Sequence, residues 1–131
     1  MIFIDSNVPM YLVGTPHPNK DSARRLLESA IARRERLVTD AEVLQEILHR
    51  YHAIQRLEAI QPAFDALLPL VDEVLSIDLG TVQRAKEIVG ASSGLSARDA
   101  VHLAAMEQAG VRQILSFDAG FDRWQTIQRM S

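Results

Sequence analysis

The sequence has no cysteine, few aromatic residues and no long hydrophobic run. Without cysteine, the 131-residue chain can form no disulfide, no thiolate nucleophile and no zinc site built on thiolates. No apolar run approaches the roughly 20 residues that cross a bilayer, so we expect no membrane-spanning helix. Aromatic residues make up only 5% of the chain, so a stacking platform for nucleic-acid bases cannot be assumed.

The chain also lacks a large excess of charge of either sign. It has 14 lysines and arginines against 17 acidic residues, a net charge of −3. This excludes a disordered acidic tail and a uniformly basic surface, but not a nucleic-acid substrate whose contact is bridged by a cation. The length suits a single domain, 1–131. An apolar start at Met1 without a basic leader favours a cytoplasmic protein.

Short apolar segments alternate with longer amphipathic ones along the chain. Residues 1–4 are apolar without alternation, which is typical of a strand covered on both faces, as in a parallel sheet. Repeated alternation of strands and helices predicts an α/β fold with a central, mainly parallel sheet. The expected strands are 1–4, 37–38, 73–77, 114–117 and a short one near 127; the expected helices are about 20–36, 40–52 with a possible continuation to 60, a segment after Pro62, 78–89 and 96–109.

Two acidic residues come directly after predicted strands. Asp5 follows the first strand and Asp118 follows the last long one, and in open α/β sheets the site lies beyond the carboxyl ends of strands. Glu46 and Asp99, both in predicted helices, are expected to face the same edge. Ionised carboxylates that converge repel each other unless a cation lies between them, and oxygen ligands suit Mg²⁺ or Mn²⁺. The four acids are therefore candidate metal ligands.

Some of these acids also have a purely structural interpretation. Thr39-Asp40-Ala41-Glu42 has the pattern of a capping box, which would give Glu42 a local role. Glu46, one turn further on, would have no such role. Ser96-Ala97-Arg98-Asp99 resembles a second capping box, and Asp122 is expected to be a surface acid. Whether Glu42 or Asp122 joins the site stays open, and the case for a site depends on the set of four acids.

Four segments, in order, resemble a known family. They are "MIFIDSNVPMYLVG", "LVTDAEVLQEILHRY", "LSARDAVHLAAMEQAG" and "ILSFDAGFD", which together span nearly the whole chain. The set is similar to PIN-domain ribonucleases, in particular to the VapC-type toxins of toxin–antitoxin pairs. The resemblance implies a three-layer α/β/α fold, a homodimer and a bound Mg²⁺ or Mn²⁺. It also implies an endoribonuclease, often directed at tRNA or ribosomal RNA, that a cognate antitoxin silences.

The resemblance also implies positions for the site residues. The four acids of the family fall on Asp5, Glu46, Asp99 and Asp118, and the hydroxyl residue that usually precedes the last acid falls on Ser116.

Three further polar features are expected to support the site. Asn7 and Ser116 are candidate hydrogen-bond donors to the metal ligands. Arg98, beside Asp99, is a candidate contact for an RNA phosphate. A separate basic group could bind RNA or could simply solubilise a helix face; its members are Lys20, Arg24, Arg25, Arg33, Arg34 and Arg36.

Three other interpretations stay open at this point. Glu46-x-x-His49 and Asp99-x-x-His102 have the acid–histidine spacing of di-iron helical bundles. A metal-free ribonuclease could use a histidine pair, and a non-catalytic PIN-like module could bind RNA or a protein partner. We expect His102 to be packed or hydrogen-bonded within its own helix, and His17, in a proline-rich loop, to be exposed to solvent.

Overall fold

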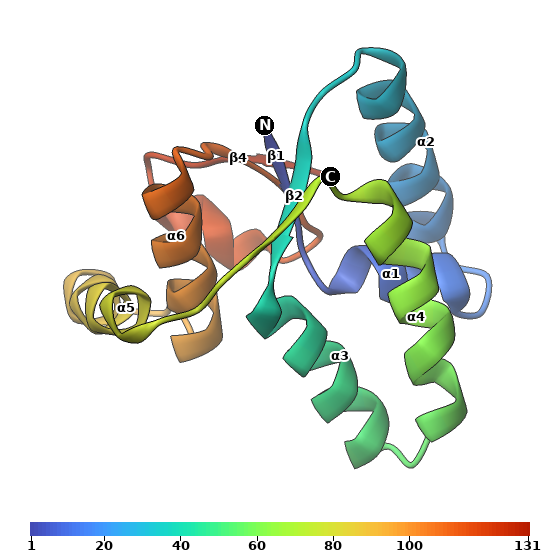
Figure 1. Cartoon of the computed structure of the whole chain (residues 1–131), viewed down its shortest axis with the longest axis horizontal. Helices are drawn as coiled ribbons and strands as arrows, with labels where there is room; N and C mark the ends of the chain where they lie inside the picture. Colours follow the sequence, from blue (N-terminus) through green and yellow to red (C-terminus); the bar gives the residue numbers. More distant parts are fainter.

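Five short strands form one sheet, and six α-helices flank it (Figure 1). The structure is a computed structural model that describes every residue, 1–131. The strands are β1 (Ile2–Ile4), β2 (Leu37–Asp40), β3 (Glu73–Leu75), β4 (Gln113–Leu115) and β5 (Gln128–Met130). The α-helices are α1 (Asn7–Val13), α2 (Pro18–Ala32), α3 (Ala41–Ala53), α4 (Ile60–Leu67), α5 (Leu79–Ala91) and α6 (Ala97–Ala109). None of these helices combines the length and the apolarity needed to span a membrane.

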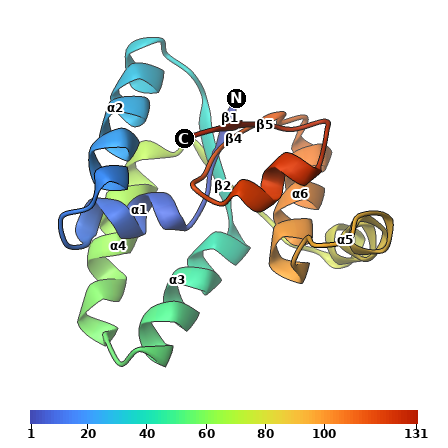
Figure 2. The ribbon, with the colours of Figure 1, turned by 180° about the vertical axis from the view of Figure 1, so that it is seen from behind.

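The sheet has the strand order β3-β2-β1-β4-β5, and every neighbouring pair is parallel. Helices α5 and α6 cover one face, and α1, α2 and α4 cover the other (Figures 1 and 2). This three-layer α/β/α arrangement confirms the predicted fold class. The central strand β1 is buried along its whole length, as its uninterrupted apolar sequence predicts.

The strand order reverses beside β1. The chain builds β1, β2 and β3 in one direction, and then returns to place β4 on the other side of β1. Because such crossovers are right-handed, the helices of the two directions lie on opposite faces of the sheet. The carboxyl ends of β1 and β4 therefore meet at the reversal point, which is where open α/β sheets bind ligands.

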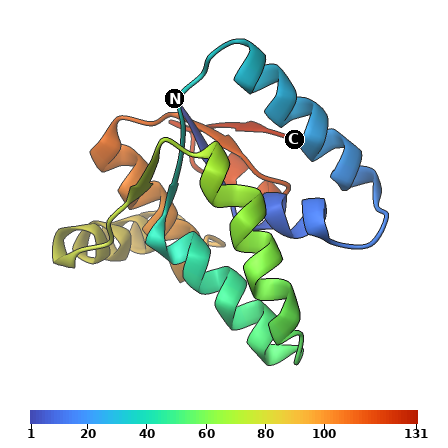
Figure 3. The ribbon, with the colours of Figure 1, turned by 45° about the vertical axis from the view of Figure 1, so that its right-hand side comes forward.

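Helices α3 and α4 form a hairpin that extends beyond the carboxyl edge of the sheet (Figure 3). The possible continuation of the first of these helices to residue 60 is wrong, because α3 ends at Ala53 and Gln55 has a left-handed φ of 57°. The helical segment expected after Pro62 begins before it, at Ile60, so Pro62 lies in the first turn of α4, where its missing N–H needs no partner. Helix α4 runs back from the hairpin and packs on α1.

Two predicted boundaries also shift because of side-chain caps and strand pairing. Helix α2 begins at Pro18, since the ring of His17 accepts a hydrogen bond from the backbone N–H of Asn19 at 3.0 Å. Strand β4 ends at Leu115, so Ser116 already lies in the loop at the carboxyl edge. His17 itself is exposed, as predicted.

The predicted capping box at residues 39–42 is wrong. Asp40 is the N-cap of α3, and its Oδ1 accepts the backbone N–H of Val43 at 2.8 Å. The hydroxyl of Thr39 instead donates to the carbonyl oxygen of Ile4 at 2.9 Å, which ties β2 to β1. Glu42 thus has no capping role.

Candidate active site

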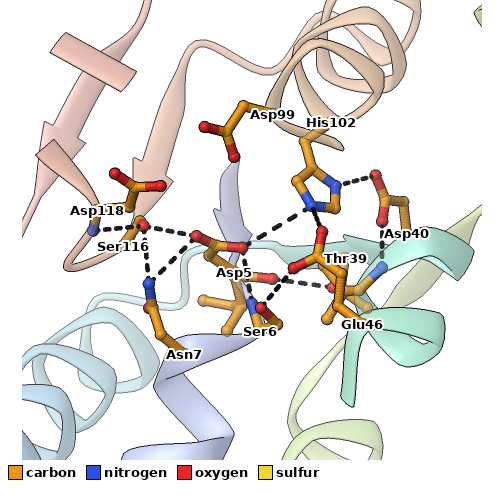
Figure 4. Close-up of polar contacts among 12 residues, drawn as sticks. Asp5, Ser6, Asn7, Thr39, Asp40, Glu46, Asp99, His102, Ser116 and Asp118 are labelled. Carbon is orange, nitrogen blue, oxygen red and sulfur yellow. Dashed lines mark hydrogen bonds and ion pairs between the residues drawn. The ribbon is translucent and has the colours of Figure 1, made fainter. Parts of the chain in front are cut away.

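Buried polar side chains gather at the carboxyl edge of the sheet. Seven polar residues are buried in the chain, and no buried side-chain nitrogen or oxygen lacks a hydrogen-bond partner. Burying a polar group is costly unless it is hydrogen-bonded, and the fold meets this requirement for every buried side chain of the network. Six of the seven lie together in Figure 4: Asp5, Ser6, Thr39, Asp40, His102 and Ser116.

Asp5 is the most deeply buried of the four predicted acids, with 4% of its surface exposed. Its Oδ1 accepts the backbone N–H of Ser6 at 2.8 Å. Its Oδ2 accepts the hydroxyl of Ser116 at 2.6 Å and the amide of Asn7 at 3.3 Å. Burial raises the pKa of Asp5; nearby His102 and these hydrogen bonds offset the rise only in part. Asp5 therefore carries a charge that is only partly compensated.

Ser116 and Asn7 link Asp5 to the loop after β4. The Ser116 hydroxyl oxygen also accepts the backbone N–H of Asp118 at 3.0 Å and the Asn7 amide at 3.2 Å. The Asn7 carbonyl oxygen accepts the backbone N–H of Phe117 at 3.3 Å. Both side chains thus lie beside the predicted acids, and both donate to Asp5. That they support metal binding stays a prediction.

Glu46 reaches the site from α3 and is held at both oxygens. Its Oε2 accepts the hydroxyl of Ser6 at 2.7 Å, and its Oε1 is hydrogen-bonded to Nε2 of His102. Burial alone would raise the pKa of Glu46, but the hydrogen bonds and the charge of His102 outweigh burial and lower it. Glu46 is therefore an ionised carboxylate aimed at Asp5.

His102 bridges two carboxylates from different elements. Its Nδ1 lies 2.8 Å from Oδ2 of Asp40, and its Nε2 contacts Glu46. Both neighbours are acceptors, and only an imidazolium can donate from both ring nitrogens. Burial lowers the pKa of His102, but the bonds to Asp40 and Glu46 outweigh it and raise that pKa well above 6.5. The site therefore contains a buried positive charge, 3.9 Å from Asp5.

His102 is packed, as predicted, with its ring buried against Phe3, but its hydrogen bonds do not lie within α6. It connects α6 to the start of α3, where Asp40 caps the helix with one oxygen and holds His102 with the other. The two residues are 62 positions apart, and no local pattern links them. The only available signal was the shared helical face of Asp99 and His102, three residues apart.

Asp99 and Asp118 lie on the other side of Asp5. Asp99 is in the first turn of α6, where its backbone N–H donates to the hydroxyl of Ser96 at 3.1 Å. A methyl group at Gly120 would lie 3.0 Å from Asp118 Oδ1 and 3.6 Å from Asp99 Oδ2, so both carboxylates face the same glycine. Burial, and then repulsion by Asp118 and Asp5, raise the pKa of Asp99 to about 6.

The structure thus brings all four predicted acids to one edge of the sheet (Figure 4). Asp5, Glu46 and His102 present ligand-type atoms within 4.8 Å of one another. His102 is unsuited as a ligand, because both of its nitrogens are already bonded to carboxylates. The remaining donors are carboxylate oxygens, and burial, followed at Asp99 by repulsion from neighbouring carboxylates, raises the pKa values of Asp5 and Asp99 despite the charge of His102. This donor set fits Mg²⁺ or Mn²⁺.

Two other acids lie outside this cluster. Burial and then repulsion by Glu46 raise the pKa of Glu42, which places Glu42 near the site, but it bonds to none of the site side chains. Asp122 forms a two-point ion pair with Arg129, with contacts of 2.9 and 3.0 Å. Its hydrogen bonds to Arg129 hold the pKa of Asp122 low, and it is exposed, as expected of a surface acid.

Basic residues divide between the two edges of the sheet. Arg98 is exposed near the site, and its charge helps to lower the pKa of Glu46. Arg36 lies at the opposite edge, where it pairs with Glu73 at the start of β3 at 2.9 Å. Arg33 is the C-cap of α2, and Arg34 follows it just before β2 begins, so this part of the predicted basic group lies toward the amino edge and does not face the acids.

The parallel sheet rules out a di-iron helical bundle. His49 is exposed on α3, and His102 is the one histidine inside the cluster. A pair of histidines for metal-free cleavage is therefore missing from the site.

The fold and the converging acids agree with a comparison against known families. A family model described as PIN domain matches residues 2–125. The chain belongs to the PIN-domain family.

Within that family, the chain is similar to VapC ribonucleases. It is 56% identical to Ribonuclease VapC13 of Mycobacterium tuberculosis over the full length of both chains. It is 38% identical to Ribonuclease VapC23 of the same organism, covering 90% of this chain and 93% of that one.

Solved structures show the same fold at low sequence identity. VapC20 of Mycobacterium tuberculosis, a sarcin–ricin-loop-cleaving toxin, is 21% identical with a TM-score of 0.77 and covers 93% of each chain. A toxin–antitoxin complex from Klebsiella pneumoniae is 13% identical with a TM-score of 0.69, covering 98% of this chain and 96% of that one.

Proposed function

We propose that this protein is a metal-dependent endoribonuclease and the toxin of a toxin–antitoxin pair. The observation that carries the proposal is the convergence of Asp5, Glu46, Asp99 and Asp118 at the reversal point of the sheet, in a chain of the PIN-domain family. The raised pKa values of Asp5 and Asp99 support the proposal, because a divalent cation would stabilise the ionised form of both carboxyls.

Asp5 and Asp118 are our candidates for direct ligands of Mg²⁺ or Mn²⁺, and Glu46 and Asp99 for ligands or for groups that orient water. A bound divalent ion would lower the pKa of water and offset the charge that develops on a phosphate. Ser116 and Asn7 hold Asp5 in place, because both of their donors point at Oδ2. His102 and Ser6 hold the two oxygens of Glu46. Such hydrolysis leaves a 5′-phosphate and a 3′-hydroxyl.

The partners follow from the relatives. RNA is the proposed substrate, because VapC13 and VapC23 are ribonucleases, and Arg98 is the candidate phosphate contact nearest the acids. Transfer RNA and ribosomal RNA are both candidate targets. A cognate antitoxin is proposed because the similar structure from Klebsiella pneumoniae is a toxin–antitoxin complex. We further propose a cytoplasmic homodimer of one domain, 1–131.

The decisive test is cleavage of total cellular RNA by the purified protein, with products mapped at single-nucleotide resolution. We expect cleavage in Mg²⁺ or Mn²⁺, none in EDTA, and 5′-phosphate ends. Asp5→Asn keeps the size of the side chain and should reduce the rate by more than the roughly 10- to 100-fold typical of groups that only support a ligand. Asp122→Asn, which removes an exposed acid outside the cluster, is the matched control.

Two results would contradict this function. Cleavage that survives EDTA and leaves cyclic phosphate ends would remove the metal mechanism. Binding of RNA without any cleavage, by wild type and Asp5→Asn alike, would favour the alternative of a non-catalytic PIN-like module that binds RNA or a protein partner.

A further inference from the structure

A row of three rings leads away from the acid cluster. Phe117 lies between Ser116 and Asp118 in the sequence. Its ring makes an edge-to-face contact with the ring of Tyr11, with the centroids 5.4 Å apart and the ring planes at 80°. Tyr11 in turn packs against His17, with centroids 4.8 Å apart. The cap that His17 provides to α2 fixes this last ring in place. A chain with few aromatic residues thus places three rings side by side next to its acids.

A cleft of about 650 Å³ lies beside the rings of Tyr11 and His17, between α1 with its following loop and the far half of α3. Its volume falls in the range of ligand-binding sites. Asn7 lines the cleft and also donates to Asp5, so the cleft opens directly next to the acid cluster. The other polar lining residues are Tyr11, Thr15, His17, Arg50, Tyr51 and Arg56.

Helices α1 and α3 each place a second polar or aromatic residue one turn beyond the residue that reaches the acid cluster. Tyr11 follows Asn7 by four positions on α1, and Arg50 follows Glu46 by four positions on α3. Residues four apart share a helical face and lie about 6 Å apart along the axis. One turn beyond the acids, α1 therefore contributes an aromatic ring and α3 contributes a guanidinium group.

Arg50 is available for an anionic ligand. It is exposed and forms no ion pair, whereas Arg56, the other arginine of the cleft, is paired with Glu58. A free guanidinium group beside aromatic rings offers contacts for both the phosphates and the bases of a nucleic acid strand.

We infer that the cleft between α1 and α3 binds single-stranded RNA next to the phosphate that is cut. Bases stack on Tyr11 and His17, and Arg50 contacts a phosphate. Stacking of this kind accepts any base, so the cleft holds the strand in position and contributes little to the choice of sequence. The inference rests on the proposed function, because it takes RNA as the substrate.

The test measures binding of a fluorescent, mixed-sequence, single-stranded oligoribonucleotide by anisotropy, in the Asp5→Asn background so that the probe stays intact. Tyr11→Leu should weaken binding about 10-fold, whereas Tyr11→Phe, which keeps the ring, should not. His17→Asn should weaken binding several-fold while keeping α2 capped, because asparagine accepts the same backbone N–H.

Arg50→Ala tests the phosphate contact separately. It should weaken binding and reduce the slope of log affinity against log salt by about 0.7, the loss of one phosphate contact to a single strand. Arg33→Ala removes the same charge at the opposite edge of the sheet and is the matched control, which should leave affinity unchanged.

The outcomes separate this inference from the proposed function. If wild type cleaves RNA but Tyr11→Leu, His17→Asn and Arg50→Ala all bind the probe as tightly as their parent, the cleft is not an RNA track and the ribonuclease function stands. If the same variants weaken only the complex with the antitoxin, the cleft is a protein interface and the inference is wrong. If wild type neither binds nor cleaves RNA, the proposed function fails as well.

Discussion

At the scale of single residues, the buried ring of His102 sets the charge of the site. It lies between Asp40 and Glu46, and both contacts require a donor from the ring. The group resembles a catalytic triad only in outline, since His102 is enclosed and both nitrogens are engaged. Its effect is to fix the Glu46 carboxylate toward Asp5 and to offset part of the negative charge around it.

We predict that His102 stays protonated at neutral pH and that Asp40 is the reason. Its raised pKa should keep the imidazolium resonances unchanged in NMR spectra between pH 6 and pH 8. In Asp40→Asn the carbonyl oxygen can still cap α3, but the amide replaces the acceptor at Nδ1, so the ring should lose its proton within that range. Cleavage by Asp40→Asn should fall because Glu46 is held less firmly.

The titration of His102 in the wild type can contradict this prediction. If His102 titrates near 6.5 in the wild type, the ring is not held as an imidazolium and the prediction is wrong.

Asp99 should make the metal-free protein less stable as pH rises. Its pKa of about 6 in the folded state exceeds the ordinary value of 3.8, so the folded state holds a proton that the unfolded state has lost. Stability from this group is therefore present below about pH 4 and is lost as pH rises through about 6. Asp99→Asn removes that loss, and above pH 7 we expect a gain of about 1 kcal/mol after allowance for solvent screening.

The measurement is the melting temperature of both chains in EDTA at pH 5 and pH 7.5. The gain from Asp99→Asn should be larger at pH 7.5, by a few degrees. An equal gain at both pH values would show that the pKa of Asp99 is not raised in the folded state.

The positions of Asp5 and Asp118 could be predicted because each follows a short apolar run that has few structural alternatives. The partner of His102 could not, since the Asp40 contact spans 62 positions and depends on how α3 and α6 pack. The role of Asp40 was also missed, because the sequence pattern assigned the N-cap of α3 to Thr39, whereas Asp40 is the N-cap.

At the scale of elements, the turn after β4 sets the distance between Asp99 and Asp118. Gly120 does not have a positive φ, so alanine fits its backbone, but the added methyl would lie 3.0 Å from Asp118 Oδ1. We predict that Gly120→Ala displaces Asp118 and weakens Mg²⁺ or Mn²⁺ binding, measured by calorimetry, with little change in melting temperature. Unchanged metal affinity would argue against Asp118 as a ligand.

Gly110, at the end of α6, differs from Gly120 in both respects: its backbone disfavours alanine, but the space around it is free. Its φ of 73° is left-handed, and nothing lies within 4 Å of an added methyl. Gly110→Ala should therefore cost about 1 kcal/mol of stability through backbone strain alone, seen as a lower melting temperature. Metal affinity of the folded protein should be unchanged, so the two glycine variants separate a site effect from a fold effect.

The elements themselves were largely predictable, and the misjudged boundaries have local causes. Strands β1 to β4 each contain consecutive apolar residues, whereas β5 (Gln128–Met130) is mostly polar. Asp78 caps α5 through a capping box with Thr81. Periodicity could not show that α3 ends at Ala53, because the apolar pattern continues to Ile60. A single left-handed residue, Gln55, turns the chain there.

At the scale of the whole molecule, the sheet separates the charges. The four acids converge at the carboxyl edge, whereas Arg33, Arg34 and Arg36 lie toward the amino edge. The sequence showed both groups but not their separation, because the direction of α2 relative to the sheet is a property of the complete fold. The result is an edge that concentrates negative charge, which the proposed divalent cation would offset.

If the proposed ion binds there, it should stabilise the whole chain, because it binds the folded state and not the unfolded one. We predict that Mg²⁺ or Mn²⁺ at 100 times its Kd stabilises the fold by about 2.7 kcal/mol, seen as a rise of several degrees in melting temperature. The rise should be larger at pH 7.5 than at pH 5, because binding must displace the proton of Asp99 at the lower pH. It should disappear in Asp5→Asn and persist in Asp122→Asn, whose acid is paired with Arg129 outside the cluster. An equal rise in Asp5→Asn would place the ion elsewhere on the surface, and the carboxyl edge would then need another explanation for its unbalanced charge.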